Sequence, residues 1–328
     1  MRRSTVSTDD DSKRAPHEAA RAVLMIRPAA FARNEVTRPT NQFQSAAADE
    51  NPERTADAAS KEFDLCATAL RRSGIDVQVF PGRTTTQLPD EVFPNNWITT
   101  HPDGTVVLYP LMAWNRRQER RRDILESLQQ QAEGFRIDRL IDLTHLEAKN
   151  CFLEGTGSLV FDHGNRLAYA CLSPRTHTNA LREFGRATGY GIITFNGRDR
   201  SGHAIYHTNV MMSLGEEFAL VCLDSIAAVD ERFRLLTRLE RSGREVIELR
   251  LDQLRSFCGN LIQLRAGEAP IIALSRQARA GLDDGQAEAL ARHGKLVTID
   301  LRTIETFGGG SARCMLAEIF LPRKSTLA

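Results

Sequence analysis

This sequence of 328 residues lacks both a long apolar run and a net charge. No stretch approaches the roughly 18 consecutive apolar residues that mark a transmembrane helix, so we expect no membrane span. Lysine and arginine together number 43 and aspartate and glutamate 42, which leaves a formal charge of +1. Proteins that bind nucleic acid or anionic membranes carry an excess of positive charge. We therefore expect neither as a partner.

Paired cysteines and nucleotide-binding loops are missing too. The cysteines are scattered, without a CxxC pair or a metal-site spacing, so we expect reduced thiols, a cytoplasmic protein and no bound metal. The glycines at residues 308–310 lack the GxGxxG spacing that precedes a dinucleotide-binding helix, and we expect no cofactor. The six cysteines are Cys66, Cys151, Cys171, Cys222, Cys258 and Cys314.

The first 20 residues differ in composition from the rest of the chain. They are polar and charged, and no apolar segment follows Arg2 and Arg3. We therefore expect residues 1–20 to be a disordered extension and not a signal peptide. No linker rich in proline, serine or glycine interrupts the remainder, so residues 21–328 are expected to form a single α/β domain.

One pattern occurs five times along that domain: a helical segment ends near a glycine, and a short apolar strand follows. The first copy is a helix at about residues 53–72 before a strand at 75–80. Each glycine fits the left-handed residue that commonly ends a helix. The glycines are Gly74, Gly134, Gly191, Gly243 and Gly294, and the strands expected after the last four cover residues 135–137, 192–195, 245–249 and 296–299.

A second pattern alternates with the first. Turn residues precede four further strands, and an apolar strand at residues 23–28 completes a fifth unit if it pairs with the C-terminal segment. Periods of about 50–60 residues in strand-rich units favour a five-bladed ββαβ propeller in one closed domain. A two-domain α/β protein is the alternative. The four strands cover residues 105–109, 166–169, 218–222 and 271–274.

Polar or reactive residues stand just before the hairpins, where packing alone would favour aliphatic side chains. The last of them, Cys314, follows a glycine-rich stretch and precedes an apolar run expected as a buried strand. Such a loop suits a nucleophile, although an ordinary buried cysteine fits the same pattern. In a propeller these residues would converge on one centre. They are Asn96, Glu154, His207, Asn209, Asn260 and Cys314.

In this order the motifs resemble those of the guanidine-modifying superfamily, which includes arginine deiminases, dimethylarginine hydrolases and amidinotransferases. The motifs are Glu154-Gly155, the His-x-Asn at residues 207–209 and the Gly-Gly-x-x-Arg-Cys that ends at Cys314. The resemblance covers about residues 21–322 and implies a five-bladed propeller. It also implies a nucleophilic Cys314, an acid/base His207 and a carboxylate, Glu154, beside that histidine.

Two departures from arginine deiminases bear on the substrate. Asn96 and Asn209 stand where those enzymes carry aspartates that pair with a guanidinium. A carboxamide cannot supply that ion pair, but its donor and acceptor suit a neutral ureido group. The phrases Phe-Pro-Asn-Asn-Trp and Leu-Glu-Gly-Thr-Gly-Ser also resemble those of citrulline-utilisation hydrolases. We therefore expect hydrolysis of the ureido C–N bonds of citrulline to ornithine, ammonia and CO₂.

Several alternatives stay open. The resemblance also fits a guanidino hydrolase like arginine deiminase or N-succinylarginine dihydrolase, or an amidinotransferase. A non-catalytic propeller that binds another protein is disfavoured, because the cysteine, histidine and glutamate occur together. The expected partner is a small ureido or guanidino amino acid, and a homo-oligomer is left open.

The remaining expectations concern residues near these motifs. We place Asn95, Asn260 and Arg313 among the substrate-binding residues, with Arg313 suited to a substrate carboxylate. The basic run at residues 116–122 is predicted to be a solvated helix face. Phe93 and Trp97 are expected to pack in the core, with a place in the pocket wall as the alternative.

Overall fold

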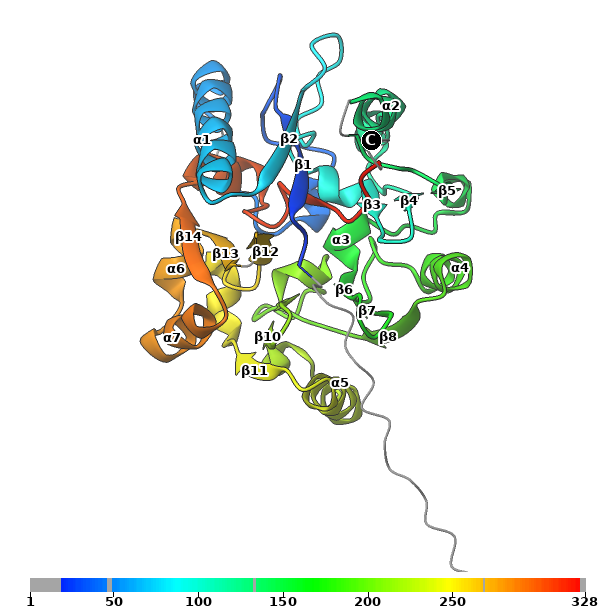
Figure 1. The fold of residues 1–328 in the computed structure, drawn as a ribbon. Helices are drawn as coiled ribbons and strands as arrows, with labels where there is room; N and C mark the ends of the chain where they lie inside the picture. Colours follow the sequence, from blue (N-terminus) through cyan, green and yellow to red (C-terminus); the bar gives the residue numbers. More distant parts are fainter. Residues whose placement is uncertain (1–18, 46–48, 132–133, 268, 325–328) are drawn as a thin grey trace, which may run out of the picture.

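The computed structural model describes residues 19–45, 49–131, 134–267 and 269–324. These residues form a mixed α/β structure with five small sheets of three strands each. Figure 1 shows the strands gathered around a common centre, with the longer helices on the outside. The predicted disordered extension lies almost wholly outside the described residues.

Each sheet has three strands, which are named below sheet by sheet, with hydrogen-bonded neighbours side by side. The strands are β15 (Ala317–Ile319), β1 (Ala22–Arg27) and β2 (Asp76–Pro81); β3 (Ile98–Thr100), β4 (Thr105–Leu108) and β5 (Arg139–Asp142); β6 (Val160–Asp162), β7 (Leu167–Cys171) and β8 (Gly191–Phe195); β9 (Met212–Leu214), β10 (Phe218–Val221) and β11 (Glu245–Glu248); β12 (Ile262–Ala266), β13 (Ala269–Ser275) and β14 (Lys295–Ile299). The helices are α1 (Pro52–Arg72), α2 (Arg122–Gln130), α3 (Gly155–Ser158), α4 (Thr178–Thr188), α5 (Val229–Arg241), α6 (Arg276–Gly281) and α7 (Asp284–Arg292).

All five sheets follow one pairing rule. The middle strand is antiparallel to the neighbour on one side and parallel to the neighbour on the other. In the first sheet β1 pairs with β15, and Leu24 lies opposite Ala317. The predicted pairing of the N-terminal strand with the C-terminal segment is therefore confirmed. It places Cys314, three residues before Ala317, at the centre of the molecule.

Local sequence explains why the elements begin and end where they do. In α1 the side chain of Asn51 accepts a hydrogen bond from the backbone of Arg54, and Pro52 occupies the first turn, where its missing N–H costs nothing. The apolar face of α1 is buried, and the helix gives way to Gly74 at φ +87°. The middle strand β10 is apolar throughout and fully buried, as expected for a strand covered on both faces.

Two sequence predictions about strands and glycines were wrong. The apolar residues 135–137 do not form a strand; Phe135 makes one isolated pairing with Arg323, and β5 begins at Arg139. Phe135 is apolar because it is buried, at 2% exposure, and not because it belongs to a strand. Of the five glycines expected to be left-handed, only Gly74 and Gly243 are.

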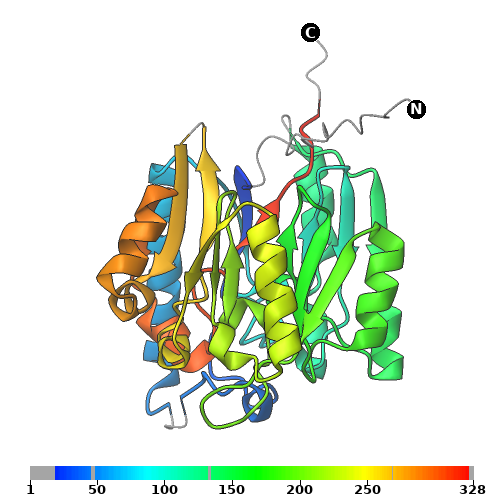
Figure 2. The same cartoon turned by 90° about the horizontal axis from the view of Figure 1, so that it is seen from below.

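The segment after β1 covers one end of the sheets. Residues 31–45 lie across that end, which is lowest in Figure 2. Four polar side chains of this segment are buried: Asn34, Thr37, Asn41 and Gln44. Within the described residues no helix combines the length and the apolar character needed to cross a membrane.

Candidate active site

A cavity with about 260 Å³ of empty space, open solvent included, is lined in part by Asn41 from residues 31–45. Its walls come from loops that precede or follow strands of different sheets, together with the glycine-rich loop before Cys314. The cavity is lined by Asn41, Asp90, Phe93, Asn96, Arg116, Arg175, Tyr206, His207, residues 308–310 and Cys314.

Glu154 and His207 form a buried pair at the cavity. Nε2 of His207 lies 2.8 Å from Oε2 of Glu154, and Arg175 lies 3.4 Å from the same oxygen. Burial alone would raise the pKa of Glu154, but Arg175 and the hydrogen bond from His207 outweigh it and hold that pKa far below its usual range. Glu154 is therefore ionised and accepts a hydrogen bond from His207. The ring proton of His207 that makes this bond is on Nε2.

The protonation of His207 follows from the same surroundings. Burial lowers the pKa of His207 to about 4, although the hydrogen bond with Glu154 acts in the opposite direction. The ring is therefore neutral at pH 7. With its proton on Nε2, its Nδ1 is an unprotonated nitrogen, as a general base requires.

The turn at α3 brings these groups together because it contains glycine. A Cβ on Gly157 would lie 2.7 Å from Nδ1 of His207 and 2.6 Å from Nδ2 of Asn96. A Cβ on Gly155 would lie 2.1 Å from the carbonyl oxygen of Asn95, and the φ of Gly155 is +45°. The turn after Glu154 can approach the neighbouring loops only without these side chains.

The loop before Cys314 is held by hydrogen bonds from two other segments. Asn41 and Gln44 donate to the carbonyl of Gly308, and the hydroxyl of Tyr206 donates to the carbonyl of Gly309 at 2.9 Å. Gly309 is left-handed, at φ +64°. These contacts fix the backbone that presents Cys314 to the cavity.

The sulfur of Cys314 is surrounded by carboxamides. Nδ2 of Asn209 lies 3.5 Å and Nδ2 of Asn260 lies 3.3 Å from Sγ. Oδ1 of Asn260 accepts a hydrogen bond from the backbone N–H of Arg313 at 3.1 Å. Both asparagines are about 1% exposed. The fold thus joins residues that are 105 and 54 positions away from the cysteine.

Asn96 is also at the cavity but has a different partner. Its Oδ1 accepts a hydrogen bond from Nη1 of Arg116 at 2.7 Å, and its Nδ2 is buried without a hydrogen-bond partner. Asp90 lies 3.5 Å from Arg116, and one of its carboxylate oxygens, Oδ1, is likewise buried and unpartnered. Burial raises the pKa of Asp90, and Arg116 opposes that rise.

Asp90, Arg116 and Arg175 line the cavity, but sequence reasoning missed them. The prediction that residues 116–122 form a solvated face was wrong for Arg116, which is 2% exposed and bonded to both Glu119 and Asn96. Glu119 lies only three positions away, but the partners Asn96 and Asp90 are 20 and 26 positions away, so the basic run alone gave no sign that Arg116 is buried.

Phe93 packs in a hydrophobic core cluster, as expected. It is buried, and it also lines the cavity.

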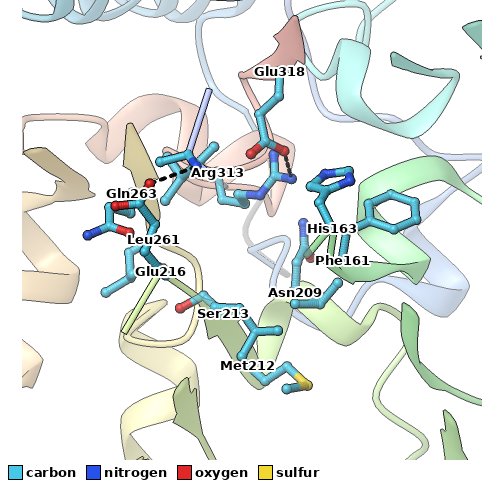
Figure 3. Close-up of a pocket in the computed structure, with 15 residues that line it drawn as sticks. Phe161, His163, Asn209, Met212, Ser213, Glu216, Leu261, Gln263, Arg313 and Glu318 are labelled. Carbon is cyan, nitrogen blue, oxygen red and sulfur yellow. Dashed lines mark hydrogen bonds and ion pairs between the residues drawn. The ribbon is translucent and has the colours of Figure 1, made fainter. Parts of the chain in front are cut away.

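Four predicted substrate-binding residues are not part of the described lining of this cavity: Asn95, Asn209, Asn260 and Arg313. Asn95 is buried beside it, and its backbone carbonyl accepts a hydrogen bond from Thr156. Arg313 lines a second cavity, with about 550 Å³ of empty space including open solvent, where it pairs with Glu318 at 2.6 Å. Figure 3 shows this pair with His163 and Asn209 around the second cavity. Arg313 is therefore not placed to bind a ligand beside Cys314.

No metal centre is evident in the described ranges. Within them, no three His, Cys, Asp or Glu side chains are grouped so as to hold a metal ion. All six cysteines lie in the described ranges and are free and buried, as expected for reduced thiols.

Comparison with known families identifies the group to which the chain belongs. Residues 27–321 match the family described as N,N-dimethylarginine dimethylhydrolase, eukaryotic. The chain is a member of the dimethylarginine dimethylhydrolase family. The resemblance of this family member to the guanidine-modifying superfamily is thereby confirmed. A comparison with curated proteins found no match.

Solved structures show the fold that this dimethylhydrolase-family chain shares. ArgZ, a cyanobacterial arginine dihydrolase, is 16% identical with a TM-score of 0.71; the match covers 93% of this chain but only 41% of ArgZ. The N-terminal domain of ArgZ, a cysteine-to-serine mutant with bound substrate, is covered over 99% of its length, at 16% identity and a TM-score of 0.69. The dimethylarginine hydrolase of Pseudomonas aeruginosa, complexed with citrulline, is 14% identical, with a TM-score of 0.62 and coverage of 92% of this chain and 100% of that one. The shared fold is the mixed α/β pentein fold.

Proposed function

We propose that this protein is a cysteine-dependent hydrolase of the ureido C–N bonds of citrulline, which it converts to ornithine, ammonia and CO₂. Cys314 is the nucleophile, His207 the acid/base and Glu154 the residue that orients His207. Asn96 binds the ureido group. Family membership supports a hydrolase that acts on C–N bonds, and the side chains at the cavity support the choice of substrate.

The observation that carries this choice is the orientation of Asn96. A guanidinium has only N–H donors, so the atom of Asn96 that lies 2.7 Å from Arg116 is the carbonyl oxygen. The free, buried atom is then the amide nitrogen, a donor. A donor pairs with the carbonyl oxygen of a ureido group and would face the N–H groups of a guanidinium. A buried donor without a partner costs about 1–3 kcal/mol, and a ureido oxygen would remove that cost.

The reaction follows from the neutral state of His207. As Sγ of Cys314 bonds to the ureido carbon, His207 accepts the thiol proton and passes it to the nitrogen that leaves. Neutral again, His207 takes a proton from water, which attacks the same carbon, breaks the C–S bond and restores the thiol. Either nitrogen can depart first. The other is then released as a carbamate, which takes up a proton and loses CO₂, so that citrulline and water give ornithine, ammonia and CO₂. Because His207 is neutral before attack, it acts first as a general base and becomes an imidazolium only when it has taken the thiol proton.

A second candidate substrate is arginine, and one observation favours it. Oδ1 of Asp90 is a buried carboxylate oxygen without a partner in a residue that lines the cavity. Such an oxygen would pair with a guanidinium. Two successive hydrolyses at the guanidinium carbon, followed by loss of CO₂ from the carbamate, would then consume two waters and release two ammonia molecules and CO₂ per ornithine.

An assay of products distinguishes the two substrates. The protein is incubated with citrulline, arginine and N-succinylarginine separately, and ornithine and ammonia are measured. We expect ornithine and ammonia in a ratio of one to one from citrulline, and at least tenfold lower kcat/KM with arginine. The variant Cys314→Ser, correctly folded by circular dichroism, should be inactive. A wild-type preference for arginine would overturn the citrulline assignment.

We propose in addition that the five sheets are the blades of a closed propeller and that residues 21–328 are one catalytic domain. The pairing of β1 with β15 supports closure. The cavity supports a single domain, since segments next to β1, β3, β4, β7, β9 and β15 all contribute to its lining.

A further inference from the structure

Two asparagines expected to bind substrate instead form hydrogen bonds with the sulfur of Cys314, and substrate binding does not explain these bonds. Among the described residues, Sγ has its hydrogen bonds with Asn209 and Asn260, at 3.5 and 3.3 Å, and none with His207. Cysteine–histidine enzymes commonly hold the ionised sulfur against a charged imidazole. In this protein the imidazole is neutral, because burial lowers the pKa of His207 to about 4.

The orientation of Asn260 is fixed by two backbone contacts. Its Oδ1 accepts the N–H of Arg313 at 3.1 Å, so that atom is the oxygen. Its Nδ2 donates to the backbone carbonyl of Asn209 at 3.1 Å as well as to Sγ. Sγ also lies 3.6 Å from Oδ1. Asn260 can therefore accept from the neutral thiol and donate to the ionised sulfur without moving.

Local sequence places this side chain. Asn260 follows Gly259, where a Cβ would lie 2.4 Å from the carbonyl oxygen of Val210. The missing side chain lets the loop before β12 approach the loop before β9, which carries Asn209. Both amides then reach the sulfur from neighbouring loops.

From this geometry we propose that Asn260 is a catalytic residue, which stabilises the ionised sulfur of Cys314 through its amide N–H, with Asn209 as a second donor. Neither amide is then primarily a substrate-binding group. This role rests on the proposed nucleophilic function of Cys314. Because hydrogen bonds to charged groups are stronger than neutral ones, loss of one amide donor should reduce the ionised fraction about tenfold or more.

Other groups around the cavity also act on the sulfur. Its lining contains the charged or titratable residues Asp90, Arg116, Arg175, Tyr206 and His207. These residues line the same cavity as Cys314 and stay there when an amide contact is lost. A test must therefore separate a direct amide donor from a general change of charge.

The test is the pH dependence of alkylation by iodoacetamide. The ionised sulfur forms an S–C bond, the C–I bond breaks and iodide leaves with its electron pair. Asn260→Asp keeps the shape and the oxygen that accepts the N–H of Arg313, but replaces the donor with a carboxylate. Asn96→Asp adds a carboxylate to the same cavity without a bond to Sγ. Label on Cys314 is measured by peptide mass spectrometry, with buried Cys151 as a reference for unfolding.

We expect Asn260→Asp to slow labelling at pH 7 about tenfold or more and to move the midpoint of the profile up by about one pH unit. Asn96→Asp should move the midpoint of the labelling profile by less than half of the shift seen in Asn260→Asp. In the citrulline assay Asn260→Asp should lower kcat with little change in KM. An unchanged labelling profile, or an equal shift in Asn96→Asp, overturns the proposal.

A second variant and the choice of reagent keep the result interpretable. If Asn260→Asp does not fold, Asn209→Asp gives the same test, since Nδ2 of Asn209 bonds to Sγ and its Oδ1 has no partner. A smaller shift in the same direction is expected, and no shift counts against the proposal. Labelling uses no substrate, so it stands even if citrulline is not hydrolysed. If the proposed hydrolysis of citrulline is wrong, only the product assay would show it.

Discussion

Three asparagines that have similar sequence settings have different partners in the fold. Asn96 bonds to Arg116 and leaves its amide nitrogen free, whereas Asn209 and Asn260 direct theirs at Cys314. Sequence reasoning placed all three near the reacting centre but treated each as a substrate ligand. Their roles differ because their hydrogen-bond partners differ. These partners lie on other loops, so the sequence around each asparagine does not predict them.

At this scale we predict that Asn96→Asp changes the choice of substrate. A carboxylate would still bond to Arg116, but it would offer an acceptor where the amide offers a donor. We expect kcat/KM for citrulline to fall at least tenfold, and the ratio of arginine to citrulline use to rise. Asn96→Ala is the control, because it removes the donor without adding charge and should weaken both substrates. Equal losses in Asn96→Asp and Asn96→Ala would contradict the account.

Because two histidines are buried and neutral, we predict that the folded protein loses stability in acid. Burial lowers the pKa of His101 to about 4, as it does for His207. A histidine with a lowered folded pKa binds its proton more readily when unfolded, so its contribution to stability is full above about pH 6.5 and is lost as the pH falls toward 4. Between pH 7 and pH 5 each residue should cost about 2 kcal/mol.

Urea unfolding at pH 7 and pH 5 measures this loss. His101→Gln should reduce the difference by about 2 kcal/mol, since it removes one titrating group. His203→Gln is the control, because the side chain of His203 is 61% exposed. If both variants lose stability as the wild type does, the buried histidines are not responsible.

At the scale of elements, short turns position the site more than long helices do. The four-residue helix α3 lies against the loops that carry Asn96 and His207, and glycine allows that contact. The strands and α1 were largely predicted from periodicity, because burial on one face leaves a regular pattern. The strand expected at residues 135–137 failed because apolar residues there pack without pairing.

The variant Gly157→Ala tests that turn. Its Cβ would meet His207 and Asn96 at 2.6–2.7 Å, so both side chains must shift. We expect kcat to fall at least tenfold, because small displacements of catalytic groups are costly. Gly285→Ala in α7 is the matched control: its nearest neighbour would be 3.6 Å away, and activity should be unchanged. Full activity in Gly157→Ala would show that the close contact is not required.

At the scale of the whole molecule, buried ion pairs join neighbouring sheets. Arg244, just before β11, pairs at 2.9 Å with Asp162 at the end of β6, and neither side chain is exposed. A mixed α/β structure and most of its strands could be predicted from sequence, but these links could not. Charged residues are normally read as surface, and only three-dimensional proximity identifies a buried pair.

We predict that Arg244→Ala destabilises the protein by about 3–5 kcal/mol, because Asp162 would remain buried without its ion-pair partner. Arg234→Ala removes an exposed pair with Asp230 and should cost less than about 1 kcal/mol. Chemical unfolding of both variants measures the difference. Similar losses would mean that the link between these sheets contributes little.

The central claim is that Cys314 forms a covalent adduct with citrulline, and its direct test is to trap that adduct. The protein is mixed with citrulline, quenched in acid within milliseconds to seconds, digested and examined by peptide mass spectrometry. The account predicts that the peptide containing Cys314 gains the mass of the substrate fragment left after one nitrogen departs, and that peptides with the other five cysteines do not. Ornithine formation without modification of Cys314 at any quench time, or with full rate in Cys314→Ser, would contradict it.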